Sequence, residues 1–333
     1  MTDELDVLRA ADPVRADEGP WRDRPLDARA EFALHRLLTS KRARQARRRL
    51  VLRAEAAVLV LVAVLAYTFS GAGAAPAAAA PPPIVPRGAT GSVPLETLAH
   101  RAEEVARSAG KDAGPRRGSH LQTWYLSMET GPDAAPPDTV PHERISRWRP
   151  DGSGSELVVA TDPRHPGKAV IDDSGGSWRT VNNGEVLRRT TYPAGSRAGG
   201  NAAGRPPTGP AALREHLAAH YGGTGPRTPQ LLSALSSFLQ EWTPGPRETA
   251  AVVRLLAGTD GLRPAGPVTD RLGRHGQAYV YDGPDGALDA TRQMVILDPR
   301  SGRLLGSEIT FTKDLPDFKI TSGEVLSYEA WMP

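Results

Sequence analysis

An unbroken apolar run, AAVLVLVAVLA, occupies residues 56–66 and constrains the fold of the chain more than any other feature. It follows a basic stretch, because residues 41–55 hold seven Lys and Arg side chains against one acidic side chain. A segment of about 20 residues suffices for an α-helix to cross a bilayer. Excess positive charge on one flank marks the side that stays in the cytoplasm. The sequence therefore predicts one transmembrane helix over residues 50–70, with the N-terminus inside the cell and the rest of the chain outside.

Two other interpretations of this segment stay open. A secretory signal peptide also has an apolar stretch of this length, and Ala72-Gly73-Ala74 would suit its cleavage. However, 55 residues precede the run, whereas an ordinary signal peptide begins with a short basic region. A buried core helix is the second alternative, and seven basic residues directly before the run argue against it. An uncleaved anchor fits the pattern best.

The charge outside this stretch is nearly balanced. Residues 1–40 carry six basic and nine acidic side chains, and residues 56–333 carry 28 of each sign. The net charge of +3 therefore comes from one short segment, and it indicates attraction to anionic lipids of the bilayer and no nucleic-acid partner. The chain contains no cysteine, which excludes disulfides, thiolate metal sites and cysteine nucleophiles.

The composition divides the chain into four parts. Residues 1–49 form a short cytoplasmic tail, and residues 50–70 form the membrane helix. Residues 71–91 are rich in Ala and Pro, a composition that builds no core and favours extended structure, so they are predicted to be a stalk. Residues 92–333 have the mixed apolar and polar pattern of a folded, exported domain.

Within this domain, the pattern predicts a helix, a group of strands, three helices and a second group of strands. The first helix begins near Leu95 and ends before Gly110. Residues 182–184, Asn-Asn-Gly, are a strong hairpin signal, and residues 298–302 are typical of a turn. Strands that precede and follow a block of helices favour an α+β fold, with a mostly antiparallel curved sheet and packed helices. The predicted strands are 121–129, 143–149, 156–161, 177–191, 267–272, 278–282, 291–297, 304–312 and 319–328, and the later helices are 211–221, 230–242 and 246–257.

Short motifs at both ends of the chain carry a resemblance. They are Asp3-Glu4-Leu5, Leu8-Arg9 and Asp12-Pro13 near the start, and Val268-Thr269-Asp270-Arg271, Gly273-Arg274, Gly276, Leu297-Asp298-Pro299 and Gly302-Arg303-Leu304-Leu305-Gly306 near the end. With these motifs the chain resembles a family of actinobacterial single-pass membrane proteins of unknown function, whose genes commonly lie beside those of extracytoplasmic-function sigma factors. The exported part is also similar, more loosely, to bacterial lipoprotein carriers and to sensors that bind anti-sigma factors. The resemblance implies an architecture and a sigma-factor neighbourhood, and no chemistry.

Two motifs suggest nucleophilic catalysis, and each has a simpler interpretation. Ser108 and Lys111 match Ser-x-x-Lys, but the partner motifs of the serine–lysine acylases are absent from the sequence. Residues 172–176, Asp-Asp-Ser-Gly-Gly, are similar to the serine region of trypsin-like proteases, yet no upstream His motif accompanies Ser174. We therefore predict that the protein is not an enzyme.

Histidine and tryptophan residues are the remaining candidates for a site. His216 and His220 stand four residues apart on one helix, a spacing that suits a metal, but no metalloprotease Glu lies between them. We expect them at the exposed face of a short helix, with no metal and no cofactor bound. Five tryptophans are expected mainly in the core, with an apolar groove for lipid or peptide as the alternative. They are Trp124, Trp148, Trp178, Trp242 and Trp331.

A candidate docking element lies in the cytoplasmic tail. Residues 26–38 place leucine and alanine side chains along one side of a short helix, which would be marginal without a partner. The leading prediction is an envelope sensor or regulator whose inner helix contacts a sigma factor or another regulator. The alternative is a membrane-tethered carrier or scaffold that binds lipid, cell-wall material or another apolar extracellular ligand.

Overall fold

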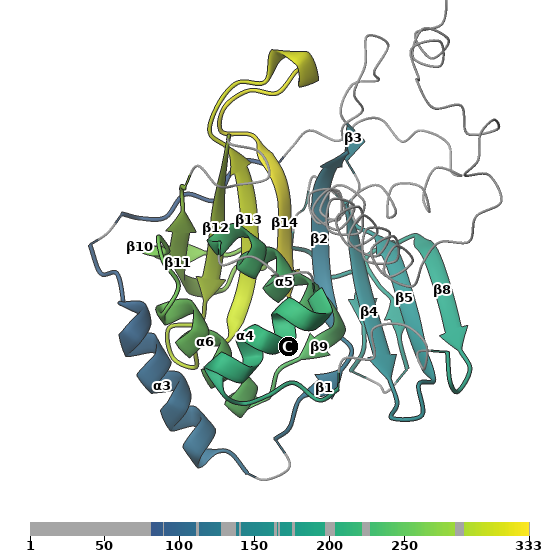
Figure 1. The fold of residues 1–333 in the computed structure, drawn as a ribbon. Helices are drawn as coiled ribbons and strands as arrows, with labels where there is room; N and C mark the ends of the chain where they lie inside the picture. The colour runs from purple at the N-terminus through teal and green to yellow at the C-terminus, as the bar shows by residue number, and fades with distance from the viewer. Residues whose placement is uncertain are drawn as a thin grey trace, which may run out of the picture. The chain divides into compact units, whose positions relative to one another are not determined.

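A computed structural model provides the fold of the C-terminal part of the chain (Figure 1). It describes residues 81–88, 90–110, 113–127, 138–139, 141–162, 165, 167–174, 177–196, 204–221, 227–283 and 290–332. Residues 1–49, predicted to be a cytoplasmic tail, and the predicted span at residues 50–70 lie outside this range. In the described ranges, no helix has both the length and the apolar character needed to cross a bilayer.

Four helices form one layer of the domain: α3 (Leu95–Ser108), α4 (Pro210–Tyr221), α5 (Thr228–Glu241) and α6 (Pro246–Ala257). Their bounds agree closely with the predicted helices because the local signals are strong. Proline occupies the first turn of α5 and of α6, where its missing N–H costs nothing. Gly258 caps α6, and its backbone N–H donates to the carbonyl groups of Arg254 and Leu256.

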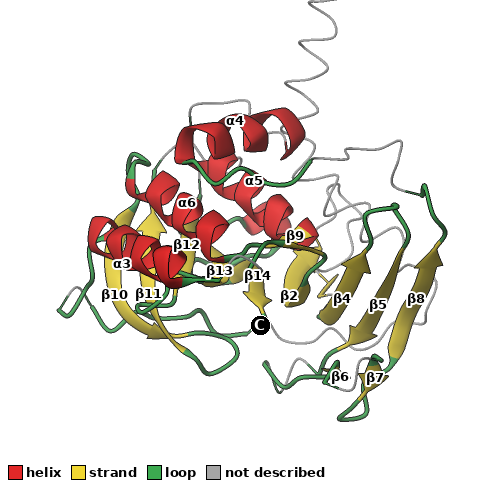
Figure 2. Ribbon diagram, turned by 90° about the horizontal axis from the view of Figure 1, so that it is seen from below, coloured by secondary structure: helices red, strands yellow, loops and turns green. Residues whose placement is uncertain are grey.

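The second layer is a ten-stranded antiparallel sheet, in the order β10-β11-β12-β13-β14-β2-β4-β5-β8, with β3 paired to β2 off this path. Figure 2 shows it as a curved band with the helices over the part from β10 to β2. Most neighbours in the sheet are also neighbours in the chain, as expected for antiparallel meanders. The strands are β2 (His120–Ser127), β3 (Asp138–Thr139), β4 (His142–Trp148), β5 (Gly154–Ala160), β8 (Val186–Tyr192), β10 (Arg263–Thr269), β11 (His275–Tyr281), β12 (Thr291–Leu297), β13 (Leu304–Phe311) and β14 (Val325–Trp331).

Two short ribbons and a single turn of 3₁₀-helix complete the described fold. β1 (Arg116–Arg117) pairs with β9 (Trp242–Thr243), and β6 (Ile171–Asp172) pairs with β7 (Arg179–Thr180). The 3₁₀ turn η1 spans Pro316–Phe318. The predicted α+β class with a large antiparallel sheet is thus confirmed.

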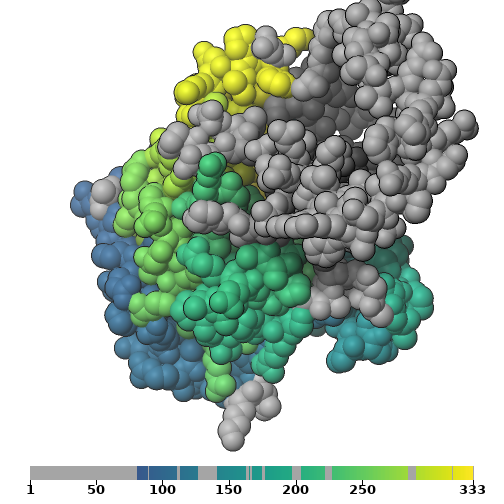
Figure 3. All heavy atoms as spheres, in the orientation of Figure 1, coloured from purple at the N-terminus to yellow at the C-terminus, as the bar shows by residue number. Residues whose placement is uncertain are grey.

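Alternating residues along the strands place apolar side chains on the two opposite faces of the sheet, where they form separate cores. On one face, which we call the helix face, Tyr279 and Val295 pack with buried residues of all four helices. In the space-filling view, the blue atoms of the segment that includes α3 lie next to green atoms from the later part of the chain (Figure 3). On the opposite face, which we call the coil face, Ala278 and Ile296 pack against Ile84. The central part of the sheet therefore has buried side chains on both of its faces.

Segments without helices cover the coil face. Residues 81–88 lie along β10, where the backbone N–H of Arg87 donates to the carbonyl of Pro267 (2.9 Å). The sequence assigned these residues to the stalk, but Ile84 is an apolar anchor within the Ala/Pro stretch and packs on the sheet. Residues 315–320 fold back over Trp124 and Tyr328.

The Asn-Asn-Gly signal forms a turn but not the predicted hairpin. Asn182 and Asn183 both have positive φ, and the backbone N–H of Gly184 donates to the carbonyl of Val181. The strands on either side do not pair with each other, because β7 pairs with β6 and β8 pairs with β5. The turn therefore sends the chain from the small ribbon back into the main sheet.

The turn at residues 298–302 is confirmed, and its glycine has a packing role. Gly302 has φ +73°, and a Cβ there would come within 2.9 Å of Ala102 and Val253. The turn therefore lies close between α3 and α6, and only glycine fits both the backbone and the space. The motif at residues 302–306, which is part of the resemblance to a family, therefore has a structural role.

Candidate functional site

An open groove of about 590 Å³ lies beside the last strands of the sheet. Its lining comes from the end of β4 (residues 147–149), the start of β5 (154–156) and the end of β8 (189–191). Ser177 and Trp178, which precede β7, complete it. We call this feature the basic groove, because three of its lining residues are arginines and only one, Glu156, is acidic.

The strand register explains which side chains meet in the groove. Arg147 is paired with Ser155, and Ser155 is paired with Thr191 on the next strand. Paired residues of an antiparallel sheet project from the same face, so these three form a row on the coil face. Arg189, two residues before Thr191, belongs to the same face. Arg147 thus adjoins Ser155 across the sheet, and Arg189 adjoins Thr191 along β8.

The charges of the groove are only partly neutralised. Arg147 pairs with Asp173 at 3.1 Å, and its Cζ lies 5.5 Å from the ring centre of Trp178. Within the described parts of the chain, no carboxylate lies within ion-pair distance of Arg149 or Arg189. Glu156 is held on the helix face by Arg144 (3.3 Å) and Arg188 (2.5 Å). The groove therefore presents excess positive charge to solvent.

A fully buried carboxylate anchors the wall of the groove. Glu143 on β4 is 0% exposed and accepts hydrogen bonds from the backbone N–H groups of Val170 (2.8 Å) and Ile171 (3.1 Å). It also accepts one from Gln122 (2.9 Å), and His120 Nε2 lies 2.7 Å away. Since Ile171 begins β6, these bonds hold the β6–β7 ribbon, and with it Trp178, against the sheet.

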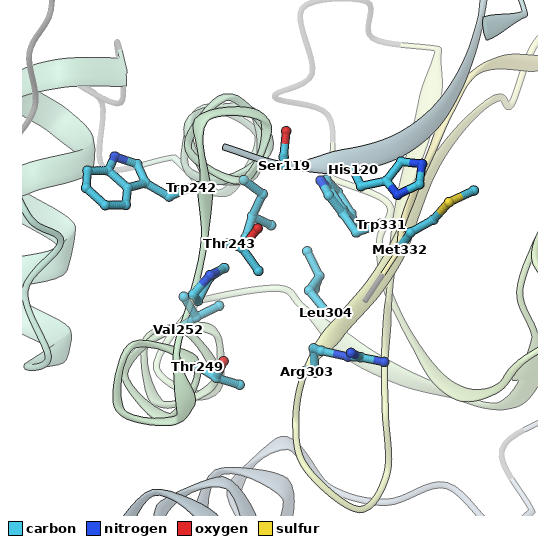
Figure 4. A pocket seen from close by; sticks show the side chains of 12 residues that line it. Ser119, His120, Trp242, Thr243, Thr249, Val252, Arg303, Leu304, Trp331 and Met332 are labelled. Atoms are coloured by element: carbon cyan, nitrogen blue, oxygen red, sulfur yellow. The ribbon is translucent and has the colours of Figure 1, made fainter. Parts of the chain in front are cut away.

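A second cavity, between the helices and the sheet, is apolar and small. Figure 4 shows Thr243, Leu304 and Trp331 around it, while the rings of His120 and Trp242 point away from its middle. Its volume is about 40 Å³, whereas ligand pockets usually measure roughly 300–1,000 Å³. We interpret it as a packing gap in the core and not as a ligand site.

A polar cluster lies beneath α5. Glu329 on β14 accepts hydrogen bonds from Ser236 Oγ (2.5 Å) and Gln240 Nε2 (2.5 Å) on α5, and from Ser307 Oγ (3.3 Å) on β13. Burial raises the pKa of Glu329, and these hydrogen bonds and the charge of Arg144 only partly oppose the shift. The cluster joins the helix layer to the sheet through a carboxyl group that the fold disfavours in its charged form.

This cluster predicts a pH-dependent stability. Because the pKa of Glu329 is higher in the folded chain than in the unfolded chain, its contribution falls as the pH rises from the ordinary value of 4.5 through the folded value. Glu329→Gln should therefore match the wild type at low pH and be more stable at neutral pH, measured as free energy of unfolding in urea. A variant that is less stable at every pH would contradict this expectation.

The structure places the two nucleophile motifs in ordinary local structure. Ser108 Oγ donates to the carbonyl of Val105 at the end of α3, and Lys111 lies outside the described residues. Asp172 accepts hydrogen bonds from the backbone and hydroxyl of Ser174 (3.0 and 2.6 Å), which with Arg179 lower the pKa of Asp172 to about 2. The region around Ser174 is thus a turn stabilised by its own aspartate.

The two histidines lie closer to the core than predicted. The rings of His216 and His220 are 4.7 Å apart, and Phe238 of α5 lies 6.5 Å from His216. Burial, and to a lesser extent the charge of His220, lowers the pKa of His216. In the described structure, no cluster of three metal-ligating side chains includes the pair. The prediction of an exposed face is wrong for these two histidines, which are only partly exposed because α4 packs on α5.

The tryptophans divide into two groups. Trp124, Trp242 and Trp331 are at most 8% exposed, which confirms the prediction of core positions. Trp148 and Trp178 are only half-buried and line the basic groove. Sequence reasoning missed this groove, although Arg147-Trp148-Arg149 and Arg188-Arg189 were visible as basic and aromatic residues on predicted strands.

Comparisons with known proteins leave the chain without a family. No protein-family model matches it, and no curated protein matches it. Among solved structures, it is similar to a LolA superfamily protein from Nitrosomonas europaea, with 9% identity and a TM-score of 0.17. The alignment covers 72% of this chain and 92% of that chain. A structural similarity this low carries no argument. The resemblance to an actinobacterial membrane-protein family stays a prediction, because no family model and no curated protein matches the chain.

Proposed function

We propose that residues 92–333 form an extracytoplasmic binding domain that holds an anionic ligand in the basic groove and performs no covalent chemistry. The observation that carries this proposal is the excess of guanidinium groups in an open groove of about 590 Å³. Arginine presents its N–H donors in a planar fork that matches carboxylate and phosphate groups. Arg189 has no ion-pair partner in the described structure and thus remains available to a ligand, whereas Arg149 lies close enough to Asp151 to lower the pKa of that carboxyl group.

The composition of the groove favours binding over catalysis. Its hydroxyl groups come from serine and threonine, but no histidine belongs to its described lining. Its one carboxylate, Glu156, is engaged by Arg144 and Arg188 on the opposite face. A serine nucleophile needs an adjacent general base, and neither group supplies one here.

The binding proposal predicts a specific loss in one variant. Arg189→Gln should weaken the binding of inorganic phosphate to the full-length chain about tenfold, because a hydrogen bond to a charged group contributes roughly 1.5–3 kcal/mol. Isothermal titration at constant ionic strength measures the affinity. Arg107→Gln is the matched control, since Arg107 is 75% exposed on α3 and does not line the groove. Equal affinities in all three proteins, or no binding to the wild type, would refute the proposal.

The location of this domain is part of the proposal. The basic stretch and the apolar run support a single-pass anchor at residues 50–70, with residues 1–49 in the cytoplasm and the binding domain outside. In this arrangement the chain acts as an envelope sensor, in which ligand binding outside is linked to a sigma factor or another regulator inside. A tethered carrier or scaffold would use the same groove without an inner partner.

The inner segment provides the test between sensor and carrier. Leu34→Asp/Leu37→Asp places two charges on the apolar side of the predicted helix at residues 26–38. For a sensor, we expect the full-length wild-type chain to retain a sigma factor in a pull-down and the double variant to lose it. If the wild-type chain retains no sigma factor and no other transcription regulator, the result favours the carrier.

A further inference from the structure

We infer that the ligand of the basic groove carries its negative charge on a sugar ring, as a phosphorylated or carboxylated sugar. This inference rests on the proposed function and specifies the class of ligand. It draws on three further properties of the groove: its size, its unpaired hydroxyl groups and the indole ring of Trp178.

The size of the groove exceeds the needs of a simple anion. A volume of about 590 Å³ lies in the range of pockets that enclose a ligand with one or more rings. A phosphate ion would contact the guanidinium groups and leave most of this space to water. The natural ligand is therefore expected to extend beyond its anionic group.

The polar groups beside the arginines suit a ligand rich in hydroxyls. Ser155 and Thr191 are paired in the strand register, and Ser177 lines the same groove from the segment before β7. None of these three hydroxyl groups makes a hydrogen bond to another described residue. Each can both donate and accept, as the hydroxyl groups of a sugar also do. A lipid chain, in contrast, would leave them without partners.

The indole ring of Trp178 supplies the apolar part of such a site. Trp178 packs on the buried cluster that includes Ile145 and Leu157, and it keeps part of its ring exposed. Trp148 lines the rim of the groove, because the strand register places it with Tyr192 (4.8 Å between ring centres) on the helix face. An amphipathic ring held at the edge of a polar groove is suited to the C–H face of a sugar. Arginine, hydroxyl and indole groups thus match the charge, the hydroxyls and the ring of an acidic sugar.

The test compares five small molecules on the full-length chain by isothermal titration: inorganic phosphate, glucose, glucose 6-phosphate, glucuronate and AMP. We expect glucose 6-phosphate or glucuronate to bind at least tenfold more tightly than either phosphate or glucose. Ser155→Ala/Thr191→Val should lower the ratio of glucose 6-phosphate affinity to phosphate affinity about tenfold, whereas Arg189→Gln should weaken both.

The possible results separate this inference from the proposed function. If phosphate binds in an Arg189-dependent way but neither acidic sugar binds more tightly, the anion groove stands and the sugar inference is overturned. If no anion binds, both fail. Tighter binding of AMP than of glucose 6-phosphate would mean that the groove recognises a stacked base and not the sugar ring. This result would also overturn the inference. Retention of phosphate binding by the double variant shows that its groove is folded.

Discussion

Glu143→Gln should destabilise the protein by about 3–5 kcal/mol, because it replaces a buried charge that four donors surround. The carboxylate is 0% exposed and contacts His120, Gln122 and the backbone N–H groups of Val170 and Ile171. Glutamine has nearly the same shape but only one acceptor oxygen. Its amide nitrogen would therefore face N–H groups that it cannot satisfy. Urea unfolding of the full-length chain measures the loss.

The same substitution should also affect the basic groove. Val170 and Ile171 lead into β6, so their release would loosen the ribbon that carries Trp178. We expect faster amide hydrogen exchange at Val170 and Ile171 and weaker phosphate binding. Glu185→Gln is the matched control, since Glu185 is exposed. A Glu143→Gln protein as stable as this control would show that the buried carboxylate is not the anchor.

Glu308→Gln should cost a similar amount, about 3–5 kcal/mol, because it removes the counter-charge of a buried arginine. Glu308 on β13 pairs with Arg271 and accepts a hydrogen bond from the backbone N–H of Ile84 (2.8 Å). The pair is buried, with 0% and 8% of the two side chains exposed. Arg271 also lies over the ring of Tyr328, which stacks on Trp124. An uncompensated cation would remain at the centre of the coil face.

A double variant tests whether the charge itself is the cause. The attraction between two buried charges often fails to repay the cost of removing both from water. Arg271→Met/Glu308→Leu should therefore recover most of the stability lost in Glu308→Gln. Glu104→Gln, on the exposed side of α3, is the control for a neutral change. A double variant less stable than the single one would mean that the pair contributes net attraction.

Local signals determined the helices and several turns of this protein. Residues 211–221, 230–242 and 246–257 were predicted helical from their periodicity, and α4, α5 and α6 have nearly these bounds. Proline at the start of a helix and glycine at its end act within one or two turns of chain, so the sequence alone reveals them. The turn at residues 298–302 follows from the same kind of short-range chemistry.

Pairing between distant strands was decided only by the tertiary structure. The Asn-Asn-Gly turn predicted a hairpin, but β8 pairs with β5, which places Arg189 and Thr191 beside Leu157 and Ser155. The basic groove exists because this register brings residues 147, 155, 178 and 189 together on one face. In the sequence, nothing distinguishes any one of these residues from an ordinary strand or loop residue. A one-residue change of register would send Arg189 to the opposite face, and no local signal specifies that register.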